Sequence, residues 1–246
     1  MQCPKCGYEQ PQSDECSSCG IIYNKRSVHT PPISRHIPSS SRDKSSASPI
    51  KTYIITVLAV LFLIYSAFNW WKSQPVIHGP GSIAPDPPKQ TETETAFFTF
   101  KDHRIIPIAD FHVNARVLSK KKYSFGRESD LSPIDLVLGW GSMSDEAVLE
   151  KIKIKQSNRF YFWSVKQFPI PEKKIKTQSA NMHLIPADSV ILKQIKNTRI
   201  GDIVNFTGYL VKVVGVDGWK WKSSLTRNDT GNRACEVVYV EDFEIQ

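Results

Sequence analysis

Residues 52–71 read TYIITVLAVLFLIYSAFNWW, twenty consecutive uncharged residues between Lys51 and Lys72. A helix of this length measures about 30 Å, because each residue adds about 1.5 Å, and this matches the hydrocarbon core of a bilayer. A Tyr near one end and two Trp at the other are residue types that favour the headgroup level. The stretch therefore predicts one transmembrane helix that divides the chain into two parts.

Two other interpretations of this run fit less well. A cleaved signal peptide begins near the N-terminus and has an apolar core of about 7–15 residues, whereas some 50 residues precede this run. A buried helix of a soluble protein would show a polar stripe, and the run contains only Thr52, Thr56, Ser66 and Asn69 as polar residues.

The basic residues on either side of the run predict its orientation. Six Lys or Arg lie between residues 25 and 51, but only Lys72 and Lys89 lie in the first 25 residues on the other side. Cytoplasmic flanks carry the excess of Lys and Arg. We therefore expect a bacterial inner-membrane protein with its N-terminus in the cytoplasm and its larger C-terminal part in the periplasm or outside the cell.

The net charge of +8 does not by itself indicate nucleic acid. Residues 1–72 carry 8 basic and 4 acidic residues, and residues 73–246 carry 24 and 20, so each part contributes +4. The excess is diffuse in the larger part and lies next to the membrane in the smaller one, where it favours anionic lipids. The expected partners are the bilayer and proteins on both sides, and nucleic acid is an unlikely one.

Four cysteines near the N-terminus have the spacing of a metal site. Cys3, Cys6, Cys16 and Cys19 form two C-x2-C pairs, each followed by glycine, with nine residues between the pairs. Two such turns supply four thiolates to one ion, which suits structural zinc. Four thiolates leave no open position for a water, so the pattern argues against metal catalysis, and a redox C-x-x-C role would not explain two matched pairs.

Composition predicts how the rest of the chain is organised. We expect a zinc ribbon at residues 1–25, a disordered basic linker at 26–51, the transmembrane helix at 52–71, a Pro/Thr-rich linker at 72–95 and an extracytoplasmic domain at 96–246. The two linkers are rich in Ser, Pro, Thr and charge, which cannot form a core. The last part, about 150 residues, is long enough for one domain.

Strand patterns dominate residues 96–246 and predict a mainly β (α+β) domain. Strands are expected at 111–118, 136–138, 159–165, 203–214, 219–225 and 235–240. Gly208 inside the long strand predicts a bulge or bend, and residues 215–218 predict a hairpin turn. Two short helices are expected, one capped by Ser144 with Val148, Leu149 and Ile152 on one face, and one capped by Asp188 or Ser189. A small OB-like barrel is the suggested architecture.

Polar residues in two segments of this domain offer alternative chemistries. Residues 179–186 contain His183, and residues 223–236 contain Ser223, Ser224, Arg227, Asp229 and Cys235. A Cys–His or Ser–His–Asp hydrolase needs such a nucleophile, base and orienting group. The alternative is that these residues are structural. Asp229 lies in a turn sequence and can pair with Arg227 as a binding or structural contact. Cys235 can be a buried thiol, and His183 can be a hydrogen-bonded, half-buried histidine.

The sequence also resembles known bacterial proteins. CPKCG and CSSCGIIYNK resemble the zinc ribbons at the N-termini of many bacterial membrane proteins, and GWGSMSD, SANMHLIPAD and WKSSLTRNDTGNRACE are similar to a family of uncharacterised bacterial membrane proteins. The resemblance implies zinc ligation by the four cysteines and no activity. The expected function is a single-pass membrane protein that links a cytoplasmic zinc ribbon to a periplasmic binding or scaffolding domain. The alternative is an extracytoplasmic hydrolase that uses Cys235, Ser223 or Ser224 with His183.

Overall fold

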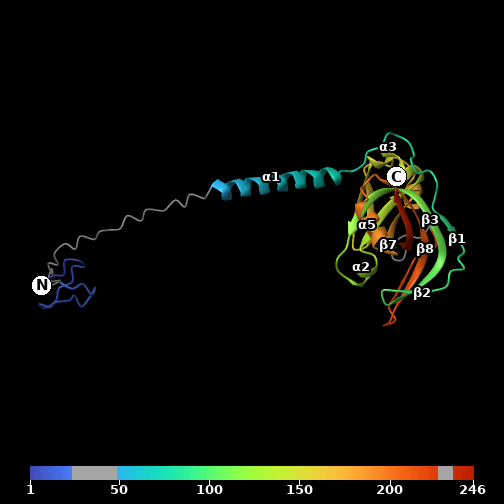
Figure 1. Cartoon of the computed structure of the whole chain (residues 1–246). Coiled ribbons are helices and arrows are strands. Elements are labelled where there is room, and N and C mark those ends of the chain that lie inside the picture. The colour runs from blue at the N-terminus through green and yellow to red at the C-terminus, as the bar shows by residue number, and fades with distance from the viewer. Residues whose placement is uncertain (24–48, 227–234) are drawn as a thin grey trace. The chain divides into compact units, whose positions relative to one another are not determined.

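The computed structural model describes residues 1–23, 49–226 and 235–246. It contains two compact units, Met1–Leu58 and Ala59–Gln246. The elements are α1 (Pro49–Lys72), β1 (Lys89–Thr91), β2 (Phe98–Phe100), β3 (His103–Lys122), α2 (Arg127–Leu131), β4 (Ile134–Gly139), η1 (Gly141–Ser144), α3 (Glu146–Leu149), β5 (Ile152–Ser157), β6 (Phe160–Val165), α4 (Glu172–Thr177), β7 (Ser179–Pro186), α5 (Ser189–Asn197), β8 (Ile203–Gly215), β9 (Lys220–Lys222) and β10 (Glu236–Ile245) (Figure 1).

Helix α1 contains the apolar run. Its segment Tyr53–Trp71, 19 residues, is long and apolar enough to cross a membrane, and none of it is buried against protein. A soluble protein would cover so much apolar surface with a core. The prediction of one helix able to span a bilayer is therefore confirmed by its length, composition and lack of protein cover.

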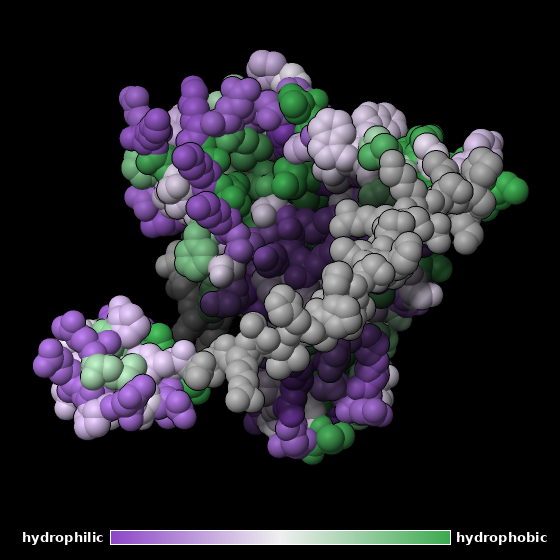
Figure 2. Space-filling view, turned by 90° about the vertical axis from the view of Figure 1, so that its left-hand side faces the viewer, coloured by the Kyte–Doolittle hydropathy of each residue, from purple (hydrophilic) through white to green (hydrophobic). Residues whose placement is uncertain are grey.

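The N-terminal residues 1–23 form a small body around the cysteines. Two isolated bridges, Gln2↔Glu9 and Glu15↔Ile22, hold its two turns. Among its described residues only Cys3, Gln10 and Cys16 are buried, and Figure 2 shows a largely hydrophilic surface on this body. These described residues form no apolar core, and the buried Cys3 and Cys16 lie at the centre of the body.

The strands of the second unit form a mixed sheet whose pairings close on themselves. Strand β3 has 20 residues and pairs antiparallel with β8 over residues 103–116 and with β4 over residues 116–122. Strand β4 pairs antiparallel with β7, β7 pairs parallel with β10, and β10 pairs antiparallel with β8. The pairings therefore run β3–β4–β7–β10–β8 and back to β3.

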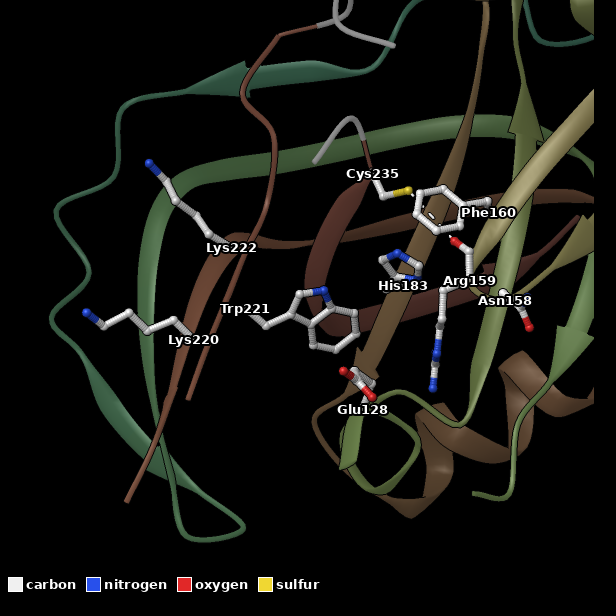
Figure 3. A pocket seen from close by; sticks show the side chains of 9 residues that line it. All are labelled: Glu128, Asn158, Arg159, Phe160, His183, Lys220, Trp221, Lys222 and Cys235. Carbon is white, nitrogen blue, oxygen red and sulfur yellow. Dashed lines mark hydrogen bonds between the residues drawn. The ribbon is translucent and has the colours of Figure 1, made fainter. Parts of the chain in front are cut away.

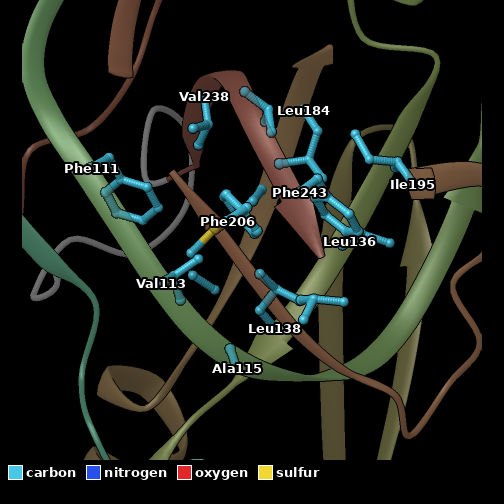
Figure 4. Packing of buried hydrophobic residues seen from close by; sticks show 14 of the residues in the cluster. Phe111, Val113, Ala115, Leu136, Leu138, Leu184, Ile195, Phe206, Val238 and Phe243 are labelled. Carbon is cyan, nitrogen blue, oxygen red and sulfur yellow. The ribbon is translucent and has the colours of Figure 1, made fainter. Parts of the chain in front are cut away.

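The main hydrophobic core lies on one face of this sheet. Alternate residues point to the same side of a strand, and each of the five strands contributes residues from one side to the cluster shown in Figure 4. In β10 the alternation shifts by one residue after Val240, at the register shift. Helix α5 adds Ile191 and Ile195, and Asp188 caps that helix by accepting hydrogen bonds from two of its backbone amides. The expected cap at Asp188 or Ser189 is therefore Asp188.

The hairpin β5–β6 is a second, two-stranded sheet. Its turn consists of Asn158 and Arg159, whose φ angles are 50° and 68°. Two-residue hairpins favour such left-handed turns because their twist matches that of the strands. The hairpin packs with Val137, Met143 and Ile175 in a separate cluster on the other face of the sheet.

Two elements differ from the sequence prediction. Asp145, not Ser144, caps helix α3, and the helix ends at Leu149, so Ile152 begins strand β5 instead of extending the helix. The alternation IKIKQS explains this, since period two is the strand period. Strand β7 is not among the strands that the sequence predicts, and it is buried along its whole length, because its polar residues are covered on the second face of the sheet.

The segment 72–95, expected as a linker, is bound to the domain over much of its length. The Val76 amide donates to the Ile200 carbonyl at 2.8 Å, and the His78 amide donates to Glu146 Oε2 at 2.9 Å. The Ala84 carbonyl accepts from the Gly141 amide at 2.8 Å, the Ala84 amide donates to Ser144 Oγ at 3.1 Å, and β1 pairs with β3. Extended segments rich in proline and threonine also fit sheet edges, which accounts for these contacts.

Candidate functional site

The four N-terminal cysteines come together in space. Their sulfur atoms all lie within 4.8 Å of one another, and the Cys3–Cys19 and Cys6–Cys16 sulfur pairs are each 3.7 Å apart. A disulfide needs about 2.05 Å, whereas thiolates about 2.3 Å from one zinc at tetrahedral corners are about 3.8 Å apart. The four cysteines can therefore hold a metal ion, and their spacing fits a closed thiolate shell.

A glycine follows each cysteine pair and has a left-handed backbone. The φ angles are 74° at Gly7 and 65° at Gly20. The Gly7 amide donates to the Cys3 carbonyl at 2.9 Å, and the Gly20 amide to the Cys16 carbonyl at 2.8 Å. Glycine adopts this conformation without steric cost, so each C-x2-C-G sequence closes into a tight turn.

The thiols of this cluster differ in acidity. Burial works to raise the pKa of Cys3, but interactions with the Tyr23 hydroxyl and nearby backbone amides outweigh it and lower the pKa to about 6. The Ile21 amide works to lower the pKa of Cys19, but burial and the neighbouring thiols raise it to about 12. Four adjacent thiolates repel one another, and a bound divalent cation would remove this conflict.

A second site lies on the other face of the sheet from the main core. It is a cavity of about 550 Å³, within the range of small-molecule sites. Helix α2, the β5–β6 turn, β7, β9 and the start of β10 supply its lining. Figure 3 shows the lining residues Glu128, Asn158, Arg159, Phe160, His183, Lys220, Trp221, Lys222 and Cys235.

A buried histidine and aspartate stand side by side behind this cavity. Asp135 of β4 and His183 of β7 are register partners, and their side chains are 0% and 4% exposed. His183 Nδ1 lies 3.0 Å from Asp135 Oδ2, although the two atoms do not meet the geometry of a hydrogen bond. Because Nδ1 faces the carboxylate, Nε2 is the nitrogen left to face the cavity.

Arg159 holds the same carboxylate from the hairpin turn. Its Nη1 donates to Asp135 Oδ1 at 2.7 Å and to the Ser132 carbonyl at 2.9 Å. Its guanidinium lies 4.0 Å from the Tyr123 ring centroid, and burial followed by the Asp135 charge raises the Tyr123 pKa. Its buried Nη2 has no hydrogen-bond partner among the described residues. A left-handed, non-glycine backbone is thus retained where the side chain has a specific partner.

Cys235 lies on the same face of the sheet as His183. Val237 is the register partner of His183 in the parallel β7–β10 pair, and Cys235 precedes it by two residues, which places both side chains on one face. The Cys235 sulfur lies 3.8 Å from the Arg159 carbonyl oxygen, and the Trp221 and His183 ring centroids are 5.0 Å apart. Figure 3 shows the Cys235 thiol and the His183 ring within one cavity.

The structure separates the predicted catalytic candidates. Ser223 is buried, donates to the Ser224 carbonyl at 2.9 Å and accepts from the Val237 amide at 3.1 Å. Ser224 is buried and exchanges hydrogen bonds with Thr226. Neither serine lines the cavity, whereas Cys235 and His183 both do. Arg227 and Asp229 lie outside the described residues.

Sequence reasoning missed Asp135 and Arg159. Asp135 follows Ile134 and precedes Leu136, so a charged residue interrupts an apolar strand. Such a residue needs a buried partner, and this was the available signal. For Arg159 the signal was the pair Asn158-Arg159 between two alternating segments, which is typical of a hairpin turn. Neither signal identifies His183 as the shared neighbour.

Comparison of the chain with protein-family models, with curated proteins and with solved structures finds no match.

Proposed function

We propose that this chain is a single-pass bacterial inner-membrane protein that links a cytoplasmic zinc ribbon to a periplasmic binding or scaffolding domain. The observation that carries the proposal is α1. In the sequence, this apolar helix without protein cover lies between a cysteine cluster that could hold a metal ion and a β domain. The excess of Lys and Arg before α1 supports a cytoplasmic N-terminus. The family resemblance of the sequence is compatible with this proposal and adds no activity.

Zinc is the proposed metal of the N-terminal body. Tetrahedral thiolate shells with sulfur–sulfur distances near those observed are typical of structural zinc, and the body has no apolar core to stabilise it without a metal. The closed shell supports a structural role. The reducing cytoplasm would keep the thiols available as ligands.

An OB-like barrel is the proposed architecture of the second unit. Five strands in a closed circuit of pairings, one parallel pair between β7 and β10, and a helix between β7 and β8 support it. Barrels of this kind bind ligands on one face and in adjacent loops. The cavity beside β7 and β9 is the proposed binding site, and an extracytoplasmic location makes nucleic acid an unlikely ligand.

The orientation can be tested with two reporters on the full chain. Alkaline phosphatase fused after Gln246 should be active, because it folds only outside the cytoplasm, whereas a green fluorescent protein at the same site should stay dark. The same reporters fused after Tyr23 of a chain truncated there are the control, for which the opposite result is expected: an inactive phosphatase and a fluorescent green fluorescent protein. A fluorescent C-terminal fusion would overturn the proposed topology.

A second candidate function is an extracytoplasmic hydrolase. The observation that favours it is that Cys235 and His183 line one cavity while Asp135 contacts His183. The serine version has no such support, because Ser223 and Ser224 bond to backbone groups outside the cavity. Only the cysteine version is retained.

A further inference from the structure

We propose that Cys235, His183 and Asp135 form a thiol acyl-transfer site for acyl compounds that carry a negative charge, a proposal that deepens the second candidate function above. Cys235 would be the nucleophile and His183 the general base. Asp135 would be a positioning residue, because it contacts His183 and not the cavity. The sequence offers Cys235 with His183 as candidates, and only the structure adds Asp135 to them.

The first argument is the fixed orientation of His183. Its ring lies between the buried carboxylate of Asp135, 3.0 Å from Nδ1, and Trp221, whose ring centroid is 5.0 Å away. A base works when a third group sets its tautomer and orientation. Arg159 and Asp135 supply that third group as a fixed pair, since Nη1 binds the other carboxylate oxygen at 2.7 Å.

The second argument is that the Asp135 carboxylate does not need His183 as a counter-charge. Arg159 already neutralises it at 2.7 Å. His183 lies against the second oxygen, Asp135 Oδ2, and its other nitrogen faces the cavity that Cys235 lines. Neutralising the carboxylate does not require this placement. It does match the requirements of a Cys–His pair.

The reaction uses only water as a co-reactant. The Cys235 S–H proton passes to His183 Nε2, and the thiolate attacks the acyl carbon, forming an S–C bond while the bond to the leaving group breaks. His183 returns the proton to the leaving alcohol or thiol. Water then attacks the thioester with His183 as the base, releases a carboxylic acid and restores the Cys235 thiol.

The charges around the cavity select the substrate class. Among the described residues, Arg159 and the acidic Glu128 line it, and Lys220 and Lys222 lie at its rim with their ammonium groups directed away from His183 (Figure 3). Arg159 places a guanidinium charge at the cavity wall, and its buried Nη2 has no partner among the described residues. Trp221 offers an apolar wall. An acyl group with a carboxylate fits these features better than a neutral one.

Thiol reactivity tests the Cys235–His183 pair in the full chain, purified in detergent micelles. Iodoacetamide alkylation of the peptide that contains Cys235 is followed by mass spectrometry, which separates it from the four N-terminal cysteines. An unassisted thiol is only a few per cent ionised at pH 7. We expect His183→Gln to slow alkylation at pH 7 by about tenfold. Equal rates in wild type and His183→Gln would overturn the proposal.

Asp135→Asn is a second variant for the same alkylation experiment, to be used if His183→Gln does not fold. It should slow alkylation at pH 7 and leave the rate at pH 10 unchanged, where the thiol is ionised without help. A merely structural change would alter both rates. Among the described residues, the charged and titratable groups around this pair include Asp135 of β4, Arg159 of the hairpin turn, Glu128 of α2, Lys220 and Lys222 of β9, Glu236 of β10, Tyr123 and Tyr161.

Substrate class is tested with 4-nitrophenyl succinate and 4-nitrophenyl butyrate, which differ in one carboxylate. Wild type should hydrolyse the succinate faster and show a succinyl adduct on Cys235, and Cys235→Ala should abolish both. Lys220→Glu with Lys222→Glu should reduce the preference about tenfold, whereas the exposed control pair Lys173→Glu with Lys193→Glu should retain it. No Cys235-dependent hydrolysis, or no preference, would refute the proposal. These assays in micelles do not depend on membrane orientation. A negative result would therefore refute the acyl-transfer site without affecting the proposed membrane topology.

Discussion

At the scale of single residues, Asp135 is the most constrained charge of the second unit. It is fully buried and contacts Arg159 and His183. Removing one partner of a buried ion pair leaves an uncompensated charge, which typically costs about 3–5 kcal/mol. We therefore expect Arg159→Met to lower the free energy of unfolding by about that amount, measured by urea denaturation.

The double variant Arg159→Met with Asp135→Asn should be more stable than Arg159→Met alone, because no buried charge is left unpaired. Arg199→Met is the matched control. Its pair with Asp202 is 3.2 Å long, but the Arg199 side chain is 44% exposed, and exposed pairs contribute about 0–1 kcal/mol. Similar losses in both single variants would contradict the special position of Asp135.

Gly208 is constrained by backbone approach. A Cβ there would collide with the backbone carbonyl of Tyr239 on the neighbouring strand, beside a register shift between Val240 and Asp242. Gly208→Ala should therefore lower the free energy of unfolding by about 1–3 kcal/mol, as overpacking does. Gly79→Ala, where no atom lies within 4 Å, should stay within about 0.5 kcal/mol of wild type, and the two unfolding midpoints measure the contrast.

At the scale of elements, the carboxylate of Glu146 is one of the groups that hold residues 76–84 against the domain. Glu146 accepts from the His78 amide at 2.9 Å and pairs with Arg116 at 2.5 Å. Burial works to raise the Glu146 pKa, but the His78 amide and Arg116 outweigh it and hold the pKa below its ordinary value. A depressed carboxyl pKa contributes stability above the unfolded value of about 4.3, and this stability is lost as the pH falls through the folded pKa.

Glu146→Gln should therefore cost about 1.5–3 kcal/mol at pH 7, the range for hydrogen bonds to charged groups, and less at pH 3. Hydrogen exchange of the amides in residues 76–84 should accelerate in the variant at pH 7. Glu150→Gln is the control, since Glu150 is exposed and is not in this network. The prediction fails if both variants show the same dependence on pH.

The elements also show what the sequence can predict. Local patterns identified β6, β8, the 215–218 turn, α5 and the outward Lys220 and Lys222 beside inward Trp221, because each depends on residues a few positions apart. Strand β7 was missed because its burial depends on β4, β10 and the β5–β6 hairpin, which lie far away in sequence. The same reason hides the pairing of Asp135 with His183, which are 48 positions apart in the sequence and are register partners in β4 and β7.

At the scale of the whole molecule, the chain divides into parts that are stabilised differently. Residues 1–23 are organised around four cysteines and have almost no buried apolar side chains, whereas the second unit has three hydrophobic clusters. Both features could be predicted from the sequence, one from the cysteine spacing and one from length and composition. The apolar run between them in the sequence could also be predicted, because a membrane-spanning helix is defined by its own length and composition and not by contacts with residues far away in the sequence.

Removal of the metal should therefore unfold the N-terminal body and leave the second unit folded. In the full chain in detergent micelles, a strong chelator should abolish the protection of amides 1–23 from hydrogen exchange, because metal binding supplies the folding free energy of such a body. The unfolding temperature of the second unit should stay within about 1 °C, since a change of 1 kcal/mol would move it by about 2–4 °C. Zinc addition should reverse the first effect. The variant Cys6→Ser with Cys19→Ser should behave like the chelated protein before any chelator is added. A parallel loss of structure in the second unit would show that the two parts share one cooperative transition.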